Sequence, residues 1–572
     1  MNRFLSPLVF CVLILAACAP PGPSQSADSQ GRGGQPAAPK ILVTAINEDP
    51  KNFWDGINGG GGSGARQLGH MVNQYLGVID STGVAHARLL AEFPAVDKGT
   101  WTVFPDGKME VTYKVRPGVT WHDGTPFTAG DIAFSFEVGR DPAIPNGNQS
   151  AVRLIEGIVA VDPQTAVATW RQTYAFADRL EHREFFPLPK HILERDYRES
   201  KETLIAQPYF NHEYVGTGPF KMTNWEPGAF MELTANDSYF LGRPKIDRVR
   251  VMFITDTNTG VANLRAGSLN IFLPSGSPDW DKLESVKQEW NATGKGDVIL
   301  ERVRWEFVEP QKGAALAQPA DLRDVRVRQA LLMSINREEV SRSLQGEFGG
   351  AAHSWVLPAF TYYPRVKDAI TEYPFDPRRA TALMADVGWT PGSDGILQKG
   401  GTRFQMKLLP DEQRAKLGTI IQQEWKTNLG IDGTIEVLSN VLLRDAEARN
   451  TALTGVGFNG NPLGGLSAVR RFASDQIPTA GNGWAGTNRG QFSNPDWDDA
   501  GLRLRTALDD DARINLERDL LRVLSAELPA LPIQYELQPI AVTGFKGLVQ
   551  ITGSPHTGNI MHTWNVHEWE VL

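Results

Sequence analysis

The chain carries its densest structural signals between Val111 and Glu137, in the stretch VTYKVRPGVTWHDGTPFTAGDIAFSFE. Apolar residues alternate with polar ones at Val111, Tyr113 and Val115, which predicts a half-buried strand. The dipeptide Pro117-Gly118 then predicts a turn. This stretch therefore begins as a strand that ends in a tight turn.

The second half of the same stretch predicts a short strand, a turn and a helix. The short strand carries Val119 and Trp121, and Asp123-Gly124 turns the chain again. Thr128 and Asp131 have the spacing of a capping box, which predicts that a helix begins here. The apolar side of this helix contains Ile132, Phe134 and Phe136. Elsewhere, strand-like segments such as 167–174 and 245–254 alternate with helix-like ones such as 257–267, which predicts a mixed α/β fold.

Length and charge restrict the class of protein. The 572 residues exceed what one hydrophobic core usually organises, so at least two lobes are expected. The formal net charge of −9 argues against nucleic acid and against binding to anionic lipid through a basic patch. The charge therefore argues that the partner of this chain is neither a nucleic acid nor an anionic lipid surface.

The N-terminus has the features of a bacterial lipoprotein signal. Arg3 precedes an apolar segment, residues 8–15, that is too short to span a bilayer. The sequence Leu15-Ala16-Ala17-Cys18 matches a lipobox, so residues 1–17 are expected to be removed and Cys18 to be lipidated. An ordinary signal with a chance cysteine is the alternative. Residues 19–39 are rich in Pro, Gly, Ser and Gln, which predicts a flexible tether to the membrane.

Several ordered blocks resemble the family 5 extracellular solute-binding proteins of bacterial ABC importers. The stretch 111–137 resembles a signature of that family, and four further blocks match other parts of it: QYLGVIDSTGVAHARLLAEFP (74–94), YVGTGPFKMTNWEPGAFMELTANDSYFLGRPKIDRVRV (214–251), DVRVRQALLMSINREEV (324–340) and FSNPDWDDAGL (492–502). The resemblance covers roughly residues 40–572 and is specific for the family rather than for a ligand.

The resemblance implies a fold and its boundaries. It implies an α/β, two-lobed periplasmic-binding-protein clamp (type II, cluster C) with an extra subdomain inserted in lobe I. Lobe I would comprise residues 40–78, 208–305 and 535–572, the inserted subdomain 79–207, and lobe II 306–534. Because lobe I is discontinuous, two strands would link the lobes as a hinge, and closure of such a hinge around ligand is a recognised switch.

The aromatic residues are the first candidates for ligand contacts, because a tryptophan can stack on a sugar, a peptide side chain or a cation. Trp54, Trp355 and Trp484 fall in irregular, Gly-rich or polar surroundings, and packing within a lobe is the alternative for each. Trp355 and His353 lie in a segment that resembles a loop lining the family's cleft. We therefore expect these four side chains to bind ligand.

The segment 454–466, TGVGFNGNPLGGL, bears on the class of ligand. In peptide-binding members of the resembled family, an aromatic residue here is usually followed within three residues by an aspartate that pairs with the peptide's α-ammonium. This chain has Phe458 followed by Asn459 and Asn461, and an amide carries no charge to offset a buried ammonium. Oligopeptide binding through a free N-terminus is therefore in doubt, unless another acid takes that role. Phe458, Asn459 and Asn461 are nevertheless expected to contact the ligand.

No pattern in the sequence indicates an enzyme. The chain has no G-x-S-x-G, P-loop, H-E-x-x-H or C-x-x-C motif, and the spacing of His556, His562 and His567 fits no helical face. We therefore predict no catalytic residues, no metal and no cofactor.

The predicted function is that of a monomeric, membrane-anchored periplasmic or extracytoplasmic receptor. It would capture a peptide-like or oligosaccharide solute and deliver it to the transmembrane subunits of an ABC permease. A sensory receptor of the same fold and an extracytoplasmic hydrolase are the alternatives.

Overall fold

A computed structural model describes residues 38–54, 68–80, 84–144, 152–178, 180, 184–274, 280–548 and 562–572. Residues Lys40–Leu572 form one compact unit. Cys18, the signal and nearly all of the tether lie outside the described residues, so their assignments stay predictions. Within the described residues, no helix is both long and apolar enough to cross a membrane.

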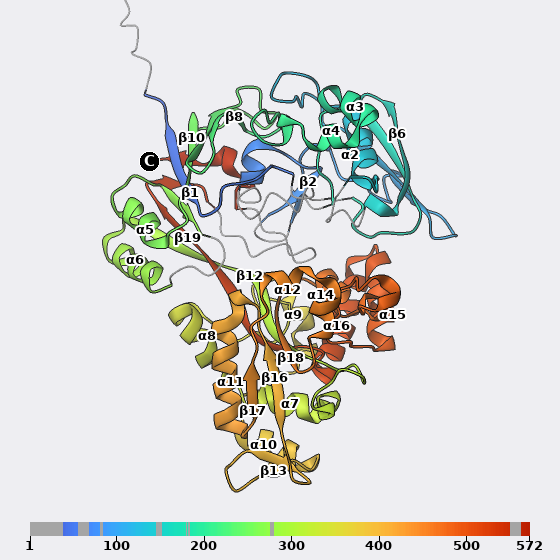
Figure 1. Cartoon of the computed structure of the whole chain (residues 1–572). Helices are drawn as coiled ribbons and strands as arrows, with labels where there is room; N and C mark the ends of the chain where they lie inside the picture. Colours follow the sequence, from blue (N-terminus) through green and yellow to red (C-terminus); the bar gives the residue numbers. More distant parts are fainter. Residues whose placement is uncertain are drawn as a thin grey trace, which may run out of the picture. The chain divides into compact units, whose positions relative to one another are not determined.

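A ten-stranded sheet runs through the unit in the order β17-β16-β18-β12-β19-β11-β1-β10-β9-β8 (Figure 1). We call lobe I the part built on strands β11, β1, β10, β9 and β8, together with helices α5 and α6. Its elements are β1 Ile41–Ile46, β8 Phe220–Glu226, β9 Phe230–Ala235, β10 Arg248–Phe253, α5 Thr257–Arg265, β11 Ile271–Leu273 and α6 Trp280–Thr293. Strand β1 is parallel to both of its neighbours, β10 and β11.

Two long strands carry the chain between the lobes, and we call them the spanning strands. They are β12, Gly296–Pro310, and β19, Leu531–Thr543. They pair antiparallel from Gly296 with Thr543 to Val308 with Leu531, and the register shifts between Arg302 and Arg304 and again between Glu306 and Phe307. A bulge bends a strand locally, so the spanning strands are irregular along the stretch that joins the lobes.

Lobe II is a mixed α/β layer structure on the other end of the spanning strands. Strand β16 lies between β17 and β18 and is parallel to both. The elements are α7 Val325–Met333, α8 Arg337–Gln345, α9 Tyr363–Val366, α10 Pro377–Asp386, β13 Thr390–Pro391, β14 Leu397–Lys399, β15 Thr402–Arg403, β16 Gln405–Leu409, α11 Ala415–Leu429, β17 Asp432–Ile435, α12 Asn440–Arg444, α13 Ala446–Thr451, β18 Val456–Pro462, α14 Gly465–Phe472, α15 Pro495–Thr506 and α16 Asp510–Glu527.

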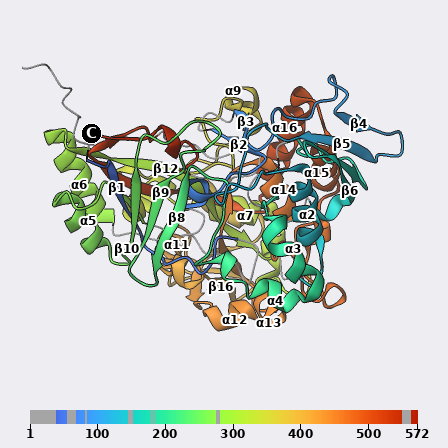
Figure 2. The ribbon, with the colours of Figure 1, turned by 90° about the horizontal axis from the view of Figure 1, so that it is seen from above.

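A separate four-stranded sheet, ordered β4-β5-β7-β6, forms the core of an insertion in lobe I. Viewed from above, its strands and helices lie at the side opposite α5 and α6 (Figure 2). Its elements are β4 Trp101–Val103, β5 Met109–Lys114, α2 Ala129–Arg140, β6 Ile155–Asp162, β7 Thr165–Trp170, α3 Lys190–Glu199 and α4 Lys201–Ile205. A hairpin of β2 Gly77–Ile79 and β3 Ala85–Ala87 precedes it, and β20 Phe545–Lys546 pairs with β21 Glu570–Val571 near the C-terminus.

The local signals of the sequence correspond closely to these elements. Strand β5 buries Val111 and Tyr113, as the alternation predicted. The capping box at the start of α2 is present, since Thr128 N donates to Asp131 Oδ2 at 2.8 Å. The predicted strand at Val119 and Trp121 is wrong, because this segment forms only an isolated bridge between Thr120 and Pro126. The residue boundaries predicted for the lobes stay predictions.

Candidate ligand-binding site

The arrangement of the parallel strands in lobe II marks a crevice. The chain leaves β16 through α11 to reach β17 on one side, and it later enters β18 on the other side. In open α/β sheets, ligands bind beyond the carboxyl ends of the strands where connections diverge in this way. The segments that follow β16 and end β18 are 410–414 and 459–463, so they flank this point.

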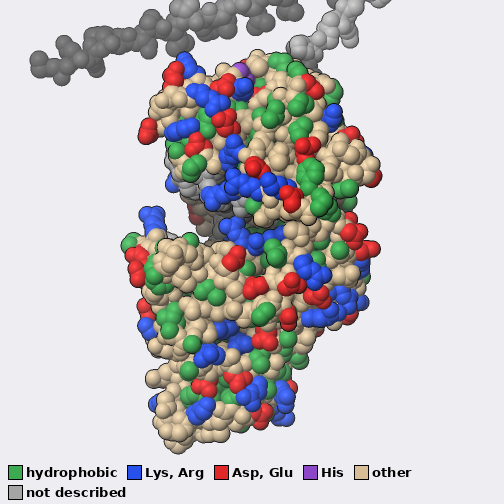
Figure 3. Space-filling model, turned by 90° about the vertical axis from the view of Figure 1, so that its right-hand side faces the viewer, with side chains coloured by type: hydrophobic (Ala, Val, Ile, Leu, Met, Phe, Trp, Pro, Cys, Tyr) green, Lys and Arg blue, Asp and Glu red, His purple; other side chains and the backbone are tan. Residues whose placement is uncertain are grey.

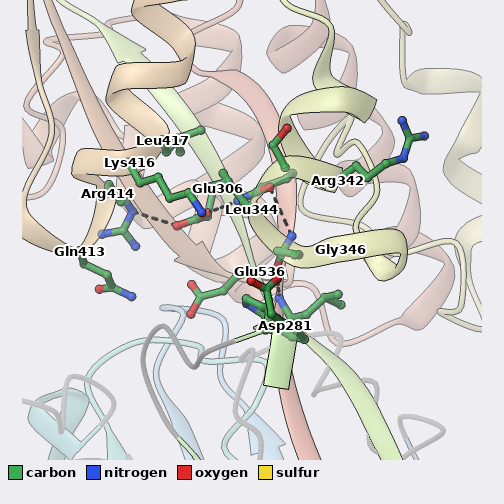
Figure 4. A pocket seen from close by; sticks show the side chains of 15 residues that line it. Asp281, Glu306, Arg342, Leu344, Gly346, Gln413, Arg414, Lys416, Leu417 and Glu536 are labelled. Atoms are coloured by element: carbon green, nitrogen blue, oxygen red, sulfur yellow. Dashed lines mark hydrogen bonds and ion pairs between the residues drawn. The ribbon is translucent and has the colours of Figure 1, made fainter. Parts of the chain in front are cut away.

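A cavity of about 350 Å³ adjoins one side of this crevice. Four groups of elements line it, and α6 is the only one of them from lobe I (Figure 4). The lining comprises Trp280 and Asp281 of α6, residues 342–346 at the end of α8, residues 413, 414, 416 and 417 around the start of α11, and Glu306, Gln534, Glu536 and Leu537 of the spanning strands. The cavity therefore lies where both lobes meet the spanning strands.

A buried ion pair forms the floor of this cavity. Glu306 Oε1 lies 3.0 Å from Arg414 Nε, and Gln534 Nε2 donates to Glu306 Oε2 at 2.7 Å (Figure 4). Arg414 Nη1 also donates to Asp411 Oδ2 at 2.7 Å. Burial alone would lower the pKa of Arg414, but the charges of Glu306, Asp411 and Glu536 outweigh it and raise that pKa. The guanidinium therefore stays charged.

A second carboxyl beside this pair is poorly compensated. Glu536 Oε2 lies 3.1 Å from Arg304 Nε. Burial raises the pKa of Glu536, and the neighbouring charge of Glu306 raises it further, although Arg304 and Arg414 act in the opposite direction. The cavity thus presents both donors and acceptors, which suits non-covalent capture of a polar solute.

The two asparagines of β18 pair with Phe307 and Trp305 of β12. They therefore lie on the face of the sheet opposite Glu306 and the cavity. Asn461 is 8% exposed, and its Nδ2 donates to Ser467 Oγ in the first turn of α14 at 3.1 Å. Asn459 Nδ2 donates to Glu309 Oε2 at 2.8 Å. Because β18 runs toward the lobe boundary, Asn461 lies nearer that boundary than Asn459 does.

Glu309 is already occupied by interactions within lobe II. It is fully buried, and its carboxylate contacts Arg471 Nη2 at 2.6 Å and accepts from Gly490 N at 2.9 Å. Burial disfavours its charge, yet Arg471 and Lys312 lower its pKa. Burial also lowers the pKa of Lys312 to about 7. Glu309 is therefore a structural acid beneath Asn459 and not a free partner for a ligand's ammonium.

Trp355 and Phe458 belong to two different cores of lobe II. Trp355 is 0% exposed and packs edge-on against Trp305 and Trp497, with ring centroids 6.2 and 5.9 Å away. Gly464 N donates to Trp355 O at 3.4 Å, which connects this segment to the loop after Asn461. Phe458 packs on the other face of β18 with the helices α7, α10 and α11.

The other three predicted contacts are scattered. Trp54 is buried in the core of lobe I between Phe186 and Phe210. Trp484 is half-buried, with a positive φ of 60°, and its carbonyl accepts from Asn450. His353 is half-buried, and burial together with the nearby Arg337 lowers its pKa.

Of the seven residues, Asn461 pairs with Trp305 of β12, which packs against Trp355, and Asn459 lies on the same face of β18. The irregular sequence surroundings of Trp54 and Trp355 suggested ligand contact, whereas both rings are packed in cores. Ligand contact by any of the seven residues stays a prediction.

Sequence reasoning missed the charged cavity altogether. A signal was present in ERVRWEFVEP, residues 301–310, where charged residues alternate with Trp305 and Phe307. Such alternation normally predicts one solvent-facing side. In β12 the charged side is covered as well, by α8, α11 and α6, so Glu306 is buried. That covering depends on contacts between residues distant in sequence.

The lobes also contact one another away from the spanning strands. Ala175 N, in the insertion, donates to Arg505 O at the end of α15 at 2.8 Å. The guanidinium carbon of Arg513 lies 5.5 Å from the ring centroid of Phe176, and Leu508 packs against the core of the insertion. Between the upper and lower bodies, Figure 3 shows a hollow with Lys and Arg side chains at its border. This arrangement is that of two lobes in mutual contact around a crevice.

Comparison with known proteins agrees with this fold. A family model for "Bacterial extracellular solute-binding proteins, family 5 Middle" matches residues 93–478. The chain is 28% identical over 346 residues to the oligopeptide-binding protein AppA of Bacillus subtilis, and the match covers 58% of this chain and 59% of AppA. It is 26% identical over 473 residues to di/tripeptide-binding protein 2 of Pseudomonas aeruginosa, covering 77% of this chain and 80% of that protein.

A solved structure extends the similarity to the whole folded unit. The structure of NikZ from Campylobacter jejuni in complex with Ni(L-His) has a TM-score of 0.69 and 21% identity, and it covers 93% of this chain and 100% of NikZ. This similarity confirms the expected two-lobed α/β fold. The curated relatives are named as binding proteins and not as enzymes. The chain therefore belongs to the bacterial extracellular solute-binding proteins of family 5.

Proposed function

We propose that this chain is the solute-binding subunit of an ABC importer, which captures a peptide-like or oligosaccharide solute between its lobes and delivers it to the permease. One observation carries the proposal, namely the polar cavity that α6 of lobe I closes against α8 and α11 of lobe II beside the spanning strands. The names of AppA and of the di/tripeptide-binding protein support a peptide-like solute.

Binding to this chain does not require a free α-ammonium on the ligand. Asn461 is the polar side chain of β18 nearest the lobe boundary. Among the residues that the structure describes, the only acid bonded to the neighbouring Asn459 is the fully buried Glu309. A buried ammonium without a compensating carboxylate costs several kcal/mol. N-blocked peptides, or neutral oligosaccharides rich in hydroxyls, fit paired amides better than a charged N-terminus does.

Calorimetry with a tripeptide and its N-acetylated form tests this ligand class. We expect the acetylated peptide to bind at least as tightly as the free one. Asn461→Asp should raise affinity for the free peptide by about tenfold or more, because a close charge pair in a desolvated site contributes at least ~1.5 kcal/mol. Asn461→Ala is the control, since it removes the amide without adding charge. Tight binding of the free peptide that is lost on acetylation would contradict the proposal.

We also propose that lipidated Cys18 anchors the protein outside the cytoplasmic membrane. The support is the lipobox and the polar tether, residues 19–39, which contains few groups able to join a core.

Cys18→Ser should therefore release the protein from the membrane fraction, or leave it unprocessed, with no change in melting temperature. Fractionation followed by thermal unfolding measures both. A wild-type protein whose membrane-extracted form carries an unmodified Cys18 thiol is the result that contradicts the anchor.

A further inference from the structure

Glu517 is a buried acid of α16 that connects three separate segments of lobe II. Its Oε2 accepts a hydrogen bond from Tyr362 OH at 3.1 Å and a longer one from Trp355 Nε1 at 3.5 Å. The carboxylate also lies against the backbone of Gly465. The side chain is buried, and no ion pair to it occurs in the described part of the chain.

The third of these contacts lies at the start of a helix whose N-cap residue has no side chain. Helix α14 begins at Gly465, and its N-cap Gly464 has a φ of 103° and no side chain to accept from the first turn. A Cβ at position 465 would lie 2.3 Å from Glu517 Oε1, so only glycine permits the carboxylate to approach this closely. A negative charge at a helix N-terminus is stabilising, because the first N–H groups lack partners within the helix.

The first turn of α14 in turn orients Asn461. Ser467 is the third residue of α14, and its Oγ accepts from Asn461 Nδ2 at 3.1 Å. A shift of this turn therefore moves the acceptor that fixes the amide. Glu517 and Asn461 thus both contact the first turn of α14, Glu517 at Gly465 and Asn461 at Ser467.

We propose that Glu517 is a positioning residue, whose ionised carboxylate fixes the first turn of α14 and thereby the orientation of the Asn461 amide toward the ligand. The part of this proposal that concerns ligand rests on the function proposed above. The part that concerns Asn461 does not require any ligand.

The proposal makes the site sensitive to pH. Burial raises the pKa of Glu517 to about 7, although the hydrogen bonds from Trp355, Tyr362 and Gly465 lower it. Below this pH the carboxyl is neutral and its interaction with the positive end of α14 is lost. Ligand affinity should therefore decrease as pH falls through about 7.

Other titratable groups lie in the same region of lobe II. Burial lowers the pKa of His353, and it lowers the pKa of Lys312, beside Glu309, to about 7, so the Glu517→Gln variant is needed to separate their titration from that of Glu517. Tyr362 faces it from the segment before α9, and burial raises the pKa of this phenol well above its usual value. Tyr535 faces the same core from β19, and burial raises its pKa as well. On α14, Arg471 is paired with Glu309, and on α16, Arg513 is paired with Asp510.

Selective labelling tests the positioning without ligand. Protein carrying ¹⁵N-labelled Trp and Asn side chains is titrated between about pH 5.5 and 8.5, a range that spans the Glu517 pKa of about 7. The Trp355 indole and Asn461 amide signals are assigned by their loss in Trp355→Phe and Asn461→Ala. Both should titrate with one midpoint near pH 7 in the wild type and neither in Glu517→Gln. Tyr362→Phe removes a donor to the carboxylate and should move both midpoints upward.

Three results decide the matter. Coincident midpoints that disappear in Glu517→Gln support the proposal. A Trp355 signal that titrates while the Asn461 signal does not overturns it, because Glu517 would then ionise without affecting the amide. A wild type in which neither signal titrates overturns it as well.

A second arm uses the N-acetylated tripeptide in calorimetry. Wild-type affinity should fall by at least about threefold between pH 8 and pH 6, as expected for a linked group that titrates in this range, whereas Glu517→Gln should show a flat profile. Equal profiles for the two proteins overturn the role in binding. If the peptide binds neither protein, the proposed ligand class fails, while the labelling experiment still decides the positioning.

Discussion

Trp355→Ala is expected to lower the free energy of unfolding by about 3–5 kcal/mol, the usual cost of truncating a fully buried tryptophan. The ring is 0% exposed and lies between Trp305 and Trp497, so alanine leaves a cavity that the neighbouring rings cannot fill without moving. The variant also removes the indole donor to Glu517. Urea unfolding followed by circular dichroism measures the loss.

Trp484→Ala is the matched control for this prediction. Trp484 is half-buried in the loop before α15. Its carbonyl accepts from Asn450 and its N–H donates to Thr479 O, and alanine retains both of these backbone contacts. Its loss should cost roughly 1 kcal/mol, the centre of the range for ordinary substitutions. If the two variants were equally stable and Trp355→Ala lost only ligand affinity, Trp355 would be a cleft residue and the core assignment would be wrong.

Arg414→Met is the second large effect, with an expected loss of about 3–5 kcal/mol at neutral pH, because removing one partner of a buried ion pair leaves an uncompensated charge. Methionine retains much of the aliphatic packing, so the loss reports chiefly on Glu306 beneath it. Arg342→Met is the control at the same cavity. Its guanidinium is half-exposed and pairs with surface acids, so its loss should cost at most about 1 kcal/mol.

The pH dependence of the Arg414→Met deficit provides a further check. Burial raises the pKa of Glu536, so this carboxyl contributes stability at low pH that is lost as pH rises through its folded pKa. Without Arg414 the repulsion between Glu306 and Glu536 increases. The deficit should therefore be largest above the folded pKa of Glu536 and shrink as the solution is acidified through it. A deficit that grows on acidification would show that Arg414 stabilises the fold by packing rather than by charge.

The sequence was informative for several elements whose signals are local, although the local pattern at Val119 and Trp121 predicted a strand that is absent there. The capping box of Thr128 and Asp131 correctly predicted the start of α2, because both hydrogen bonds form within one turn. The alternation in 245–254 likewise predicted β10, Arg248–Phe253. Helix α5 begins at Thr257 as expected, and Asp256 caps it. Each of these features depends on residues within a few positions of one another.

The remaining features depend on partners that are distant in the chain. Glu306 is buried because α8, α11 and α6 cover its side of β12, and Gln534, more than two hundred residues away, donates to it. No pattern of neighbouring residues in the sequence predicts which residue of β19 lies beside Glu306. Trp54 illustrates the same limit. The rings that enclose it, Phe186 and Phe210, come much later in the chain, after the four-stranded sheet of the insertion. The segment 454–466 was singled out only for its bearing on ligand class, and its place in strand β18, Val456–Pro462, was not predicted.

Native mass spectrometry of the protein purified from its cells tests the central claim most directly, namely that this chain binds a solute in its cleft and releases it unchanged. The account predicts a one-to-one non-covalent adduct whose mass, after denaturation, is that of an intact peptide-like or oligosaccharide solute. That solute should bind again to the refolded protein. Conversion of the recovered solute into products by the protein, or failure of the recovered solute to bind again, would contradict the account.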